Sequence, residues 1–126
     1  MPFDSGMELK VKGVPKSNPI RFTIDLGHSE DVIALHFDFR FNYFGEERTI
    51  VLNSFEYGSW KEEQRERNFP FVAGQEFEMN ISFNNDYFYI HLHNGKMIIF
   101  PNRLGDNNYK YLSMCGDVMV NSIQVK

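Results

Sequence analysis

The stretch Leu35-His36-Phe37-Asp38-Phe39-Arg40-Phe41 alternates apolar and polar side chains without interruption. Successive side chains of a β-strand point to opposite faces, so the four apolar residues would share one face and His36, Asp38 and Arg40 the other. The apolar face predicts a strand that covers a hydrophobic core. The polar face sets an imidazole, a carboxylate and a guanidinium in a row on rigid backbone, which suits the binding of a polar ligand.

The same alternation recurs in further segments along the chain, and turns rich in Gly, Asn and Asp separate these segments. It predicts strands over residues 7–14, 20–26, 32–41, 48–55, 63–67, 76–83, 87–92, 96–100, 111–115 and 118–125. Asn94-Gly95 lies between two of these runs and is typical of a tight β-hairpin. We find no amphipathic helix, internal repeat or linker. The pattern therefore predicts one all-β domain over residues 1–126, built as an antiparallel sandwich or barrel.

The composition is that of a globular protein, with 126 residues of which 42% are hydrophobic and 16% aromatic. A net charge of −4 and the lack of a basic stripe argue against nucleic acid as a partner. No run approaches the roughly 18 apolar residues of a membrane span, so we expect no membrane insertion. Cys115 is the only cysteine, and residues 1–13 lack the pattern of a secretory signal. These features predict a soluble protein made in the cytosol.

Three motifs follow one another in the first two thirds of the chain. They are His36-Phe37-Asp38-Phe39-Arg40, Val51-Leu52-Asn53 and Trp60-Lys61-Glu62-Glu63-Gln64-Arg65. In this order they resemble the carbohydrate-recognition signature of the galectins, the soluble lectins that bind β-galactosides, which reads His-x-Asn-Pro-Arg, Val-x-Asn and Trp-x-x-Glu-x-Arg. Phe69-Pro70-Phe71 and Phe100-Pro101-Asn102-Arg103 are also similar to that family. The resemblance runs from about Phe3 to Lys126, which is nearly the whole chain.

The resemblance implies an antiparallel two-sheet jelly-roll β-sandwich that forms a single carbohydrate-recognition domain, without catalytic activity, metal or cofactor. It implies β-galactosides such as lactose or N-acetyllactosamine as ligands, carried by glycoproteins or glycolipids. It also implies a protein found both in the cytoplasm and, by non-classical secretion, outside the cell. A homodimer of uncertain geometry is expected. The carbohydrate-binding residues carried over are His36, Asp38, Arg40, Asn53, Trp60, Glu63 and Arg65.

The chemistry of these side chains fits a pyranose independently of the family. A sugar ring offers hydroxyl groups along its edge and a patch of C–H groups on one face. Trp60 can stack on that patch and contribute roughly 1 kcal/mol beyond the burial of area. His36, Arg40 and Asn53 can bond an axial hydroxyl and the ring oxygen, which separates galactose from glucose. Glu63 can accept from a further hydroxyl while neighbouring guanidiniums hold its carboxylate.

The chain departs from the family pattern in the first motif. Asp38 stands where the family has Asn, and an ionised carboxylate can only accept hydrogen bonds. It would also lie near Glu63 and repel it unless Arg40 and Arg65 offset the two charges. Phe39 replaces the motif proline, so the local bend that proline favours is expected to be lost. Phe44 stands where related members often carry another histidine near the ligand.

Two other functions are compatible with these residues. Asp38 and Glu63 could form the carboxylate pair of a glycoside-processing enzyme, although adjacent guanidiniums would keep both ionised, whereas a general acid needs a raised pKa. A galectin fold with drifted or lost galactoside specificity is the other alternative, because of Asp38 and Phe39. His91 and His93 have the spacing of a metal-binding pair, but no third ligand is apparent, so we expect no metal site.

Overall fold

The structure is a computed structural model that describes residues 2–126. The described chain consists of short and medium strands joined by turns and contains no helix that could cross a membrane. The strands are β1 (Phe3–Asp4), β2 (Glu8–Pro15), β3 (Arg21–Ser29), β4 (Val32–Tyr43), β5 (Glu46–Glu56), β6 (Ser59–Trp60), β7 (Gln64–Glu66), β8 (Phe77–Phe83), β9 (Tyr87–Leu92), β10 (Met97–Pro101), β11 (Asn108–Tyr109), β12 (Tyr111–Gly116) and β13 (Val118–Val125).

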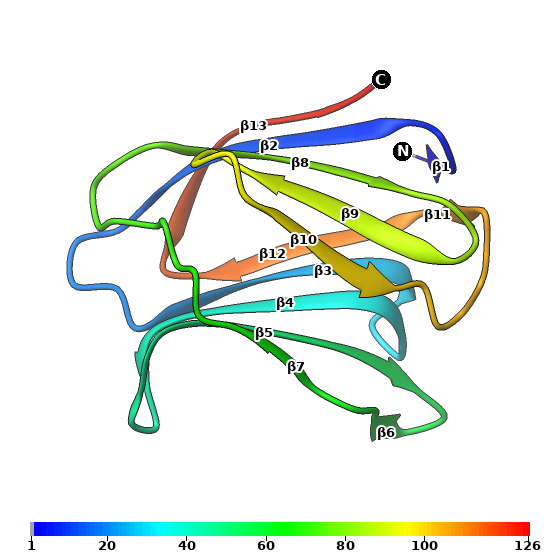
Figure 1. Ribbon diagram of the computed structural model, residues 1–126, viewed down its shortest axis with the longest axis horizontal. Coiled ribbons are helices and arrows are strands. Elements are labelled where there is room, and N and C mark those ends of the chain that lie inside the picture. Colours follow the sequence, from blue (N-terminus) through cyan, green and yellow to red (C-terminus); the bar gives the residue numbers. More distant parts are fainter. Residues whose placement is uncertain (1) are drawn as a thin grey trace.

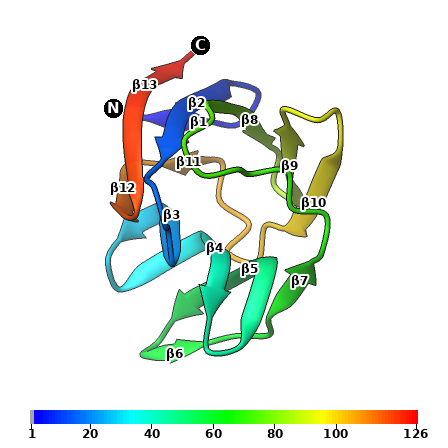
Figure 2. The ribbon, with the colours of Figure 1, turned by 90° about the vertical axis from the view of Figure 1, so that its left-hand side faces the viewer.

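Two antiparallel sheets lie face to face, as Figure 1 and Figure 2 show. A five-stranded sheet has the order β10-β9-β8-β2-β13. A six-stranded sheet has the order β12-β3-β4-β5-β6, with β7 also paired to β5. The short strands β1 and β11 pair at one end. This arrangement confirms the predicted antiparallel β-sandwich.

The aromatic side chains between the sheets explain why the alternating stretch decides the fold. Leu35, Phe37 and Phe39 are completely buried, while Phe41 packs against the core from its rim. The ring of Phe39 stacks on Phe22 at 4.5 Å and on Phe37 at 5.3 Å. Phe39 therefore takes part in core packing, and β4 pairs with β3 and β5 at this residue without a register shift. Burial of such side chains stabilises a domain by about 1.5–3 kcal/mol each.

Most predicted strands are present, and the differences lie where the elements are shortest. The predicted strand over residues 63–67 is reduced to β7, so Glu63 lies just outside it. The strands β1, β6 and β11 were not predicted, because two residues give no measurable alternation. The side chain of Gln64 bridges the two sheets, since its Nε2 donates to the carbonyl of Ile99 in β10 at 3.0 Å.

Two hairpins of the six-stranded sheet have tight turns of the same form. The turn between β4 and β5 has Phe44 at φ 49° and Gly45 at φ 80°. The turn between β5 and β6 has Tyr57 at φ 55° and Gly58 at φ 75°. Two successive residues with positive φ are typical of a type I′ turn, whose twist matches that of the flanking strands. Both turns therefore place a bulky aromatic residue where Asn or Gly is usual.

Candidate carbohydrate-binding site

An open cavity of about 460 Å³ lies on the outer face of the six-stranded sheet, away from the core. Six of the seven predicted ligand residues line it, namely His36, Asp38, Arg40, Asn53, Trp60 and Glu63. The register explains this gathering, because His36 lies opposite Asn53 and Asp38 opposite Val51 across β4 and β5. Directly opposed residues of an antiparallel pair share one face. The strands thus bring together motifs that are far apart in the sequence.

His36 is oriented by a neighbour that the sequence motifs did not include. Its Nδ1 donates to the carboxylate of Asp25, the residue opposite it on β3. With Nδ1 committed to that bond, Nε2 is the ring nitrogen left for a ligand. The imidazole also packs against the indole of Trp60, with 4.6 Å between the ring centres. The ring of Phe55 contacts the same indole, with 5.0 Å between the ring centres. Trp60 remains 50% exposed, so a broad apolar surface is available beside a polar one.

Asp38 is held between two arginines rather than exposed to solvent. Its side chain is only 3% exposed, and its two carboxylate oxygens accept from Nε of Arg21 and Nε of Arg40, each at 2.9 Å. The expected offset is present, with Arg40 paired to Asp38 and Arg65 to Glu63, and Arg21 adds a second guanidinium to Asp38 that was not expected. Partial burial acts to lower the pKa of Arg21, but the hydrogen bond to Asp38 raises it overall. Both guanidiniums lie over the ring of Tyr43, at 4.5 and 5.2 Å.

Glu46, which the sequence placed in a turn, is the acidic centre beside the cavity. It accepts from Nη1 of Arg40 and from Nε of Arg65, the latter at 2.8 Å, and Arg67 approaches it at 3.6 Å. The hydrogen bond from Arg65 is the main reason that the pKa of Glu46 falls to about 2. Arg65 also donates to Glu63 at 2.8 Å. Arg65 thus lies next to the cavity without lining it, and it acts on the cavity by holding the carboxylates of Glu46 and Glu63.

Asn53 is 4% exposed and has little freedom to bind a ligand. Its Oδ1 accepts from the backbone N–H of Ser54 at 2.7 Å and from Nη1 of Arg103 at 3.1 Å. Its Nδ2 donates to the carbonyl of Lys61 at 3.0 Å, which leaves one N–H for a sugar. The amide therefore offers a ligand one donor, and it also holds the backbone that follows Trp60.

Arg103 completes this support from the loop after β10. Besides Asn53, it donates to the hydroxyl of Ser54 at 3.0 Å and to the carbonyl of Glu62 at 2.7 Å. Its guanidinium stacks on Phe100 at 4.8 Å. Partial burial of the guanidinium lowers the pKa of Arg103. The charge of Glu62 acts in the opposite direction but is the smaller influence. The segment between Trp60 and Glu63 is thereby fixed to the sandwich. Residue 103 lies in one of the family-like stretches, but nothing in its spacing indicated this role.

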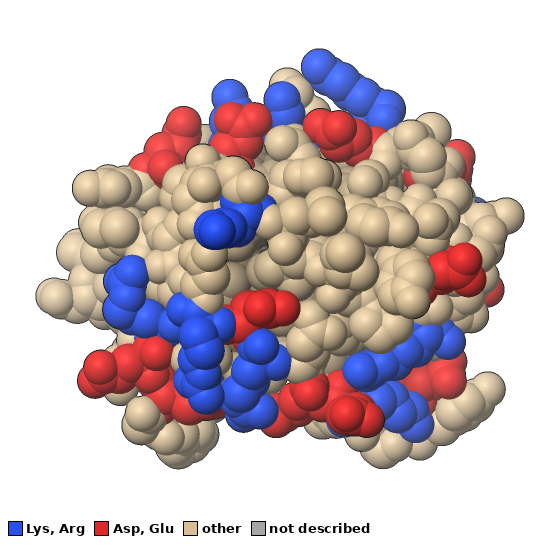
Figure 3. All heavy atoms as spheres, viewed as in Figure 1, with Lys and Arg blue, Asp and Glu red and all other residues tan. Residues whose placement is uncertain are grey.

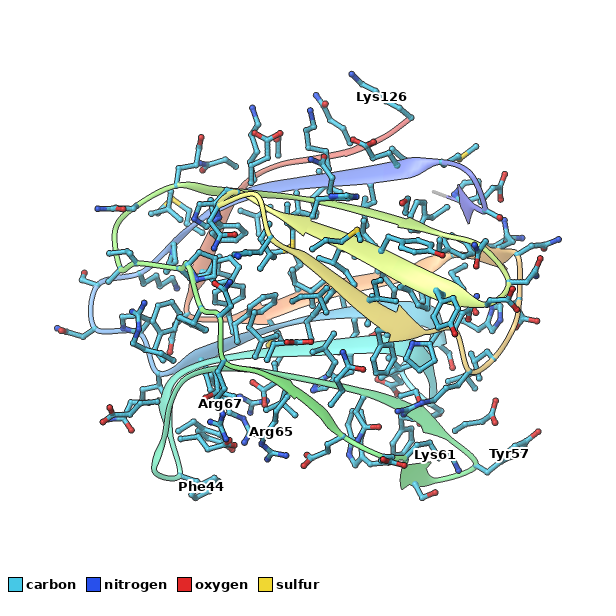
Figure 4. All side chains as sticks on the ribbon, viewed as in Figure 1. Phe44, Tyr57, Lys61, Arg65, Arg67 and Lys126 are labelled. Carbon is cyan, nitrogen blue, oxygen red and sulfur yellow. The ribbon has the colours of Figure 1, made fainter. Side chains whose placement is uncertain are left out.

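The basic side chains of the site project from the outer face of the sheet. Figure 4 shows Lys61, Arg65 and Arg67 pointing away from the sandwich on the side of β5, β6 and β7. The carboxylates of Asp38, Glu46 and Glu63 are each bonded to an arginine. The lowered pKa of Glu46 is the opposite of the raised pKa that a general acid needs. Within residues 2–126, no three His, Cys, Asp or Glu side chains are grouped to hold a metal ion.

Comparison with known proteins agrees with this geometry. The family model for galactoside-binding lectins matches residues 1–125. Galactose-binding lectin l-1 of Anguilla japonica is 47% identical over 96% of this chain and 85% of its own length. Congerin-2 of Conger myriaster is 39% identical over 100% of this chain and 93% of its own. The solved structure of congerin II with lactose and MES superposes with a TM-score of 0.97, covering 100% of this chain and 95% of that one at 39% identity. The chain belongs to the galactoside-binding lectin family.

Proposed function

We propose that this protein is a lectin that binds β-galactosides such as lactose and N-acetyllactosamine in the cavity on the six-stranded sheet. The observation that carries the proposal is the half-exposed indole of Trp60 beside the free edge of His36 and the guanidinium of Arg40. This pairing of a flat apolar surface with fixed polar groups fits both parts of a pyranose. The structure of a relative with lactose supports the same ligand class.

In this proposal the seven residues have different tasks. Trp60 stacks on the C–H face of galactose, and His36 Nε2, Arg40 and the free N–H of Asn53 bond its hydroxyls and ring oxygen. Glu63 accepts from a further hydroxyl, while Arg65 holds Glu63 and reaches toward the second sugar. Asp38 acts chiefly by fixing Arg40 and Arg21. No bond of the sugar is broken, as expected of a lectin rather than an enzyme.

A lactose titration by isothermal calorimetry tests the proposal. The control ligand is a disaccharide that ends in glucose, which differs at the axial hydroxyl. Saturable heat with lactose alone supports the proposed function. Slow release of monosaccharides would instead support a glycoside-processing enzyme, and the absence of any heat would support a fold with drifted specificity. Arg40→Lys is an informative variant, because lysine keeps the charge but cannot provide the forked donors of a guanidinium.

We further propose that the physiological partners are galactose-ended glycans of glycoproteins or glycolipids, met after non-classical secretion of a protein that also occurs in the cytoplasm. The free thiol of Cys115, which is exposed, is in keeping with synthesis in a reducing compartment. Assay of the culture medium and of the cytosolic fraction of expressing cells, with a strictly cytosolic marker protein as control, tests this distribution.

We propose that the protein forms a homodimer through the side of the sandwich where β12 and β13 lie. The strands β12 and β13 are the edges of their respective sheets, and Figure 2 shows them on the same side of the molecule. Met119 is 61% exposed and Val120 is 41% exposed on this edge. Exposed apolar edge strands favour pairing with another chain. Sedimentation analysis should show a dimer that Val120→Lys converts to a monomer, whereas Ile99→Lys on the opposite side should leave it intact.

A further inference from the structure

Two aromatic side chains at hairpin tips are not explained by folding. Phe44 is 89% exposed and Tyr57 is 90% exposed, so neither contributes much to the core. Both have a positive φ, a conformation in which bulky residues are strained and Asn or Gly is preferred. Strained, exposed and apolar side chains at two equivalent turns favour a role in contact with a partner over a role in stability.

Neighbouring residues hold both aromatic rings in an outward position. The ring of Tyr43 packs against Phe44 with 4.5 Å between ring centres. The ammonium group of Lys61 lies over the ring of Tyr57 at 6.0 Å and donates to the hydroxyl of Ser59 at 3.2 Å. Such support lowers the entropy lost when the rings meet another surface. The tips are therefore prepared for contact.

The two tips flank the sugar cavity. They lie at opposite ends of β5, a strand of 11 residues that spans about 35 Å at the usual rise per residue. Figure 1 shows the two turns at the lower corners of the molecule, and Figure 4 shows Phe44 and Tyr57 there, on the side toward which Lys61, Arg65 and Arg67 point. In Figure 3 uncharged atoms protrude at both corners, with charged side chains between them. A flat surface could touch both tips while the cavity between them holds a sugar.

We propose that Phe44 and Tyr57 are a two-point contact with the headgroup region of a lipid bilayer, used when the cavity binds the galactose of a membrane glycolipid. Tyr is enriched at this boundary between water and hydrocarbon, and Phe is among the residues that interfacial helices bury there. The charges between the tips are largely compensated, since Arg65 is paired with both Glu46 and Glu63. A zwitterionic surface therefore suits this face better than a strongly anionic one.

This inference rests on the proposed galactoside binding and adds a second source of affinity to it. Insertion of two side chains to headgroup depth does not require a membrane-spanning segment. The sugar cavity and the two aromatic side chains belong to the same molecule. Once the cavity has bound a glycolipid, the aromatic side chains therefore meet the bilayer at a high effective concentration. Each ring should strengthen vesicle binding by about tenfold, as expected for the removal of one aromatic side chain from water.

The test compares the parent protein with the double variant Phe44→Asn plus Tyr57→Asn. Asn adopts the required φ readily, so the variant should melt at a higher temperature than the parent. Binding is measured to phosphatidylcholine vesicles that contain lactosylceramide and, by calorimetry, to free lactose. Phe44 stands where related members often carry a histidine near the ligand, but in this structure neither Phe44 nor Tyr57 lines the cavity, so lactose affinity should be unchanged. Vesicle affinity should fall by about a hundredfold, since each of the two rings contributes about tenfold. Tyr87→Asn, which removes a 45% exposed aromatic from the other sheet, is the matched control and should bind vesicles like the parent.

The results that would refute the membrane contact differ from the result that would refute galactoside binding. Vesicle binding of the double variant equal to that of the parent would remove any role of the tips. An equal loss of binding to a soluble galactose-ended glycoprotein would assign the tips to glycan or protein contact instead of lipid. Phe44→Trp plus Tyr57→Trp should restore or exceed the parental vesicle affinity. A parent protein that fails to bind free lactose would refute the galactoside site itself.

Discussion

Arg103 supports the ligand-binding segment without contacting the cavity, so its substitution should weaken sugar binding indirectly. Arg103→Lys removes at least two of the three hydrogen bonds to Asn53, Ser54 and Glu62 and the planar stacking on Phe100. Hydrogen bonds to a charged group contribute about 1.5–3 kcal/mol each before the cost of burying that charge. Since burial of this guanidinium is itself costly, we expect a net loss of about 1.5–2 kcal/mol in the free energy of unfolding.

Loosening of the segment after Trp60 should also cost about tenfold in lactose affinity, because part of the binding free energy is then spent on ordering it. Trp60 is the only tryptophan, so acrylamide quenching of its fluorescence reports directly on this segment and should increase in the variant. The matched control is Arg48→Lys, which alters a guanidinium that also bonds a backbone carbonyl, that of Phe69, and lies over the Phe69 ring. The control should lose stability but keep its lactose affinity. Parental quenching and affinity in Arg103→Lys would refute the positioning role.

Three further outcomes are expected. Trp60→Ala should leave the fold intact and weaken lactose binding by about 1.5–3 kcal/mol in calorimetry, and unchanged affinity would place the sugar elsewhere. Asp38→Asn should lower the free energy of unfolding by about 1–2 kcal/mol in urea titrations, a value reduced because Arg21 is 34% exposed. It should also weaken lactose binding a few-fold in calorimetry, because Arg40 is then held less firmly for the sugar, and tighter binding would contradict this positioning role. Because the pKa of Glu46 falls from 4.5 to about 2 on folding, its contribution to stability should be complete above pH 4.5 and be lost as the pH falls through about 2, and Glu46→Gln should remove this part of the pH dependence.

The sequence predicted the fold well because alternation is a strong signal over long strands. Residues 35–41 have the predicted two faces, with Phe37 and Phe39 in the core and Asp38 directed toward the cavity. The strands that escaped prediction are those with two residues, which owe their conformation to their partners rather than to their own pattern. Propensity alone does not determine such short pairings.

The site was only partly predictable, since its motifs name the residues but not their hydrogen-bond partners. Asp25 and Arg21 lie on β3, opposite His36 and Arg40, and that register depends on the fold as a whole. Glu46 occurs in a stretch that reads as turn chemistry, so its bonds to two arginines had no sequence signal. Partners that are distant in sequence become apparent only when the strands are paired.

The bridge from Gln64 to the carbonyl of Ile99 has a consequence for how copies of the chain can assemble. It occupies a polar backbone group on the β10 edge, on the side of the sandwich away from β12 and β13. A sandwich with two open sides could add copies end over end and grow into a fibre. In the proposed homodimer, which pairs through β12 and β13, this occupied carbonyl would help growth to stop at two chains. Such a pair would present two cavities and could crosslink two glycans without forming an endless polymer of its own.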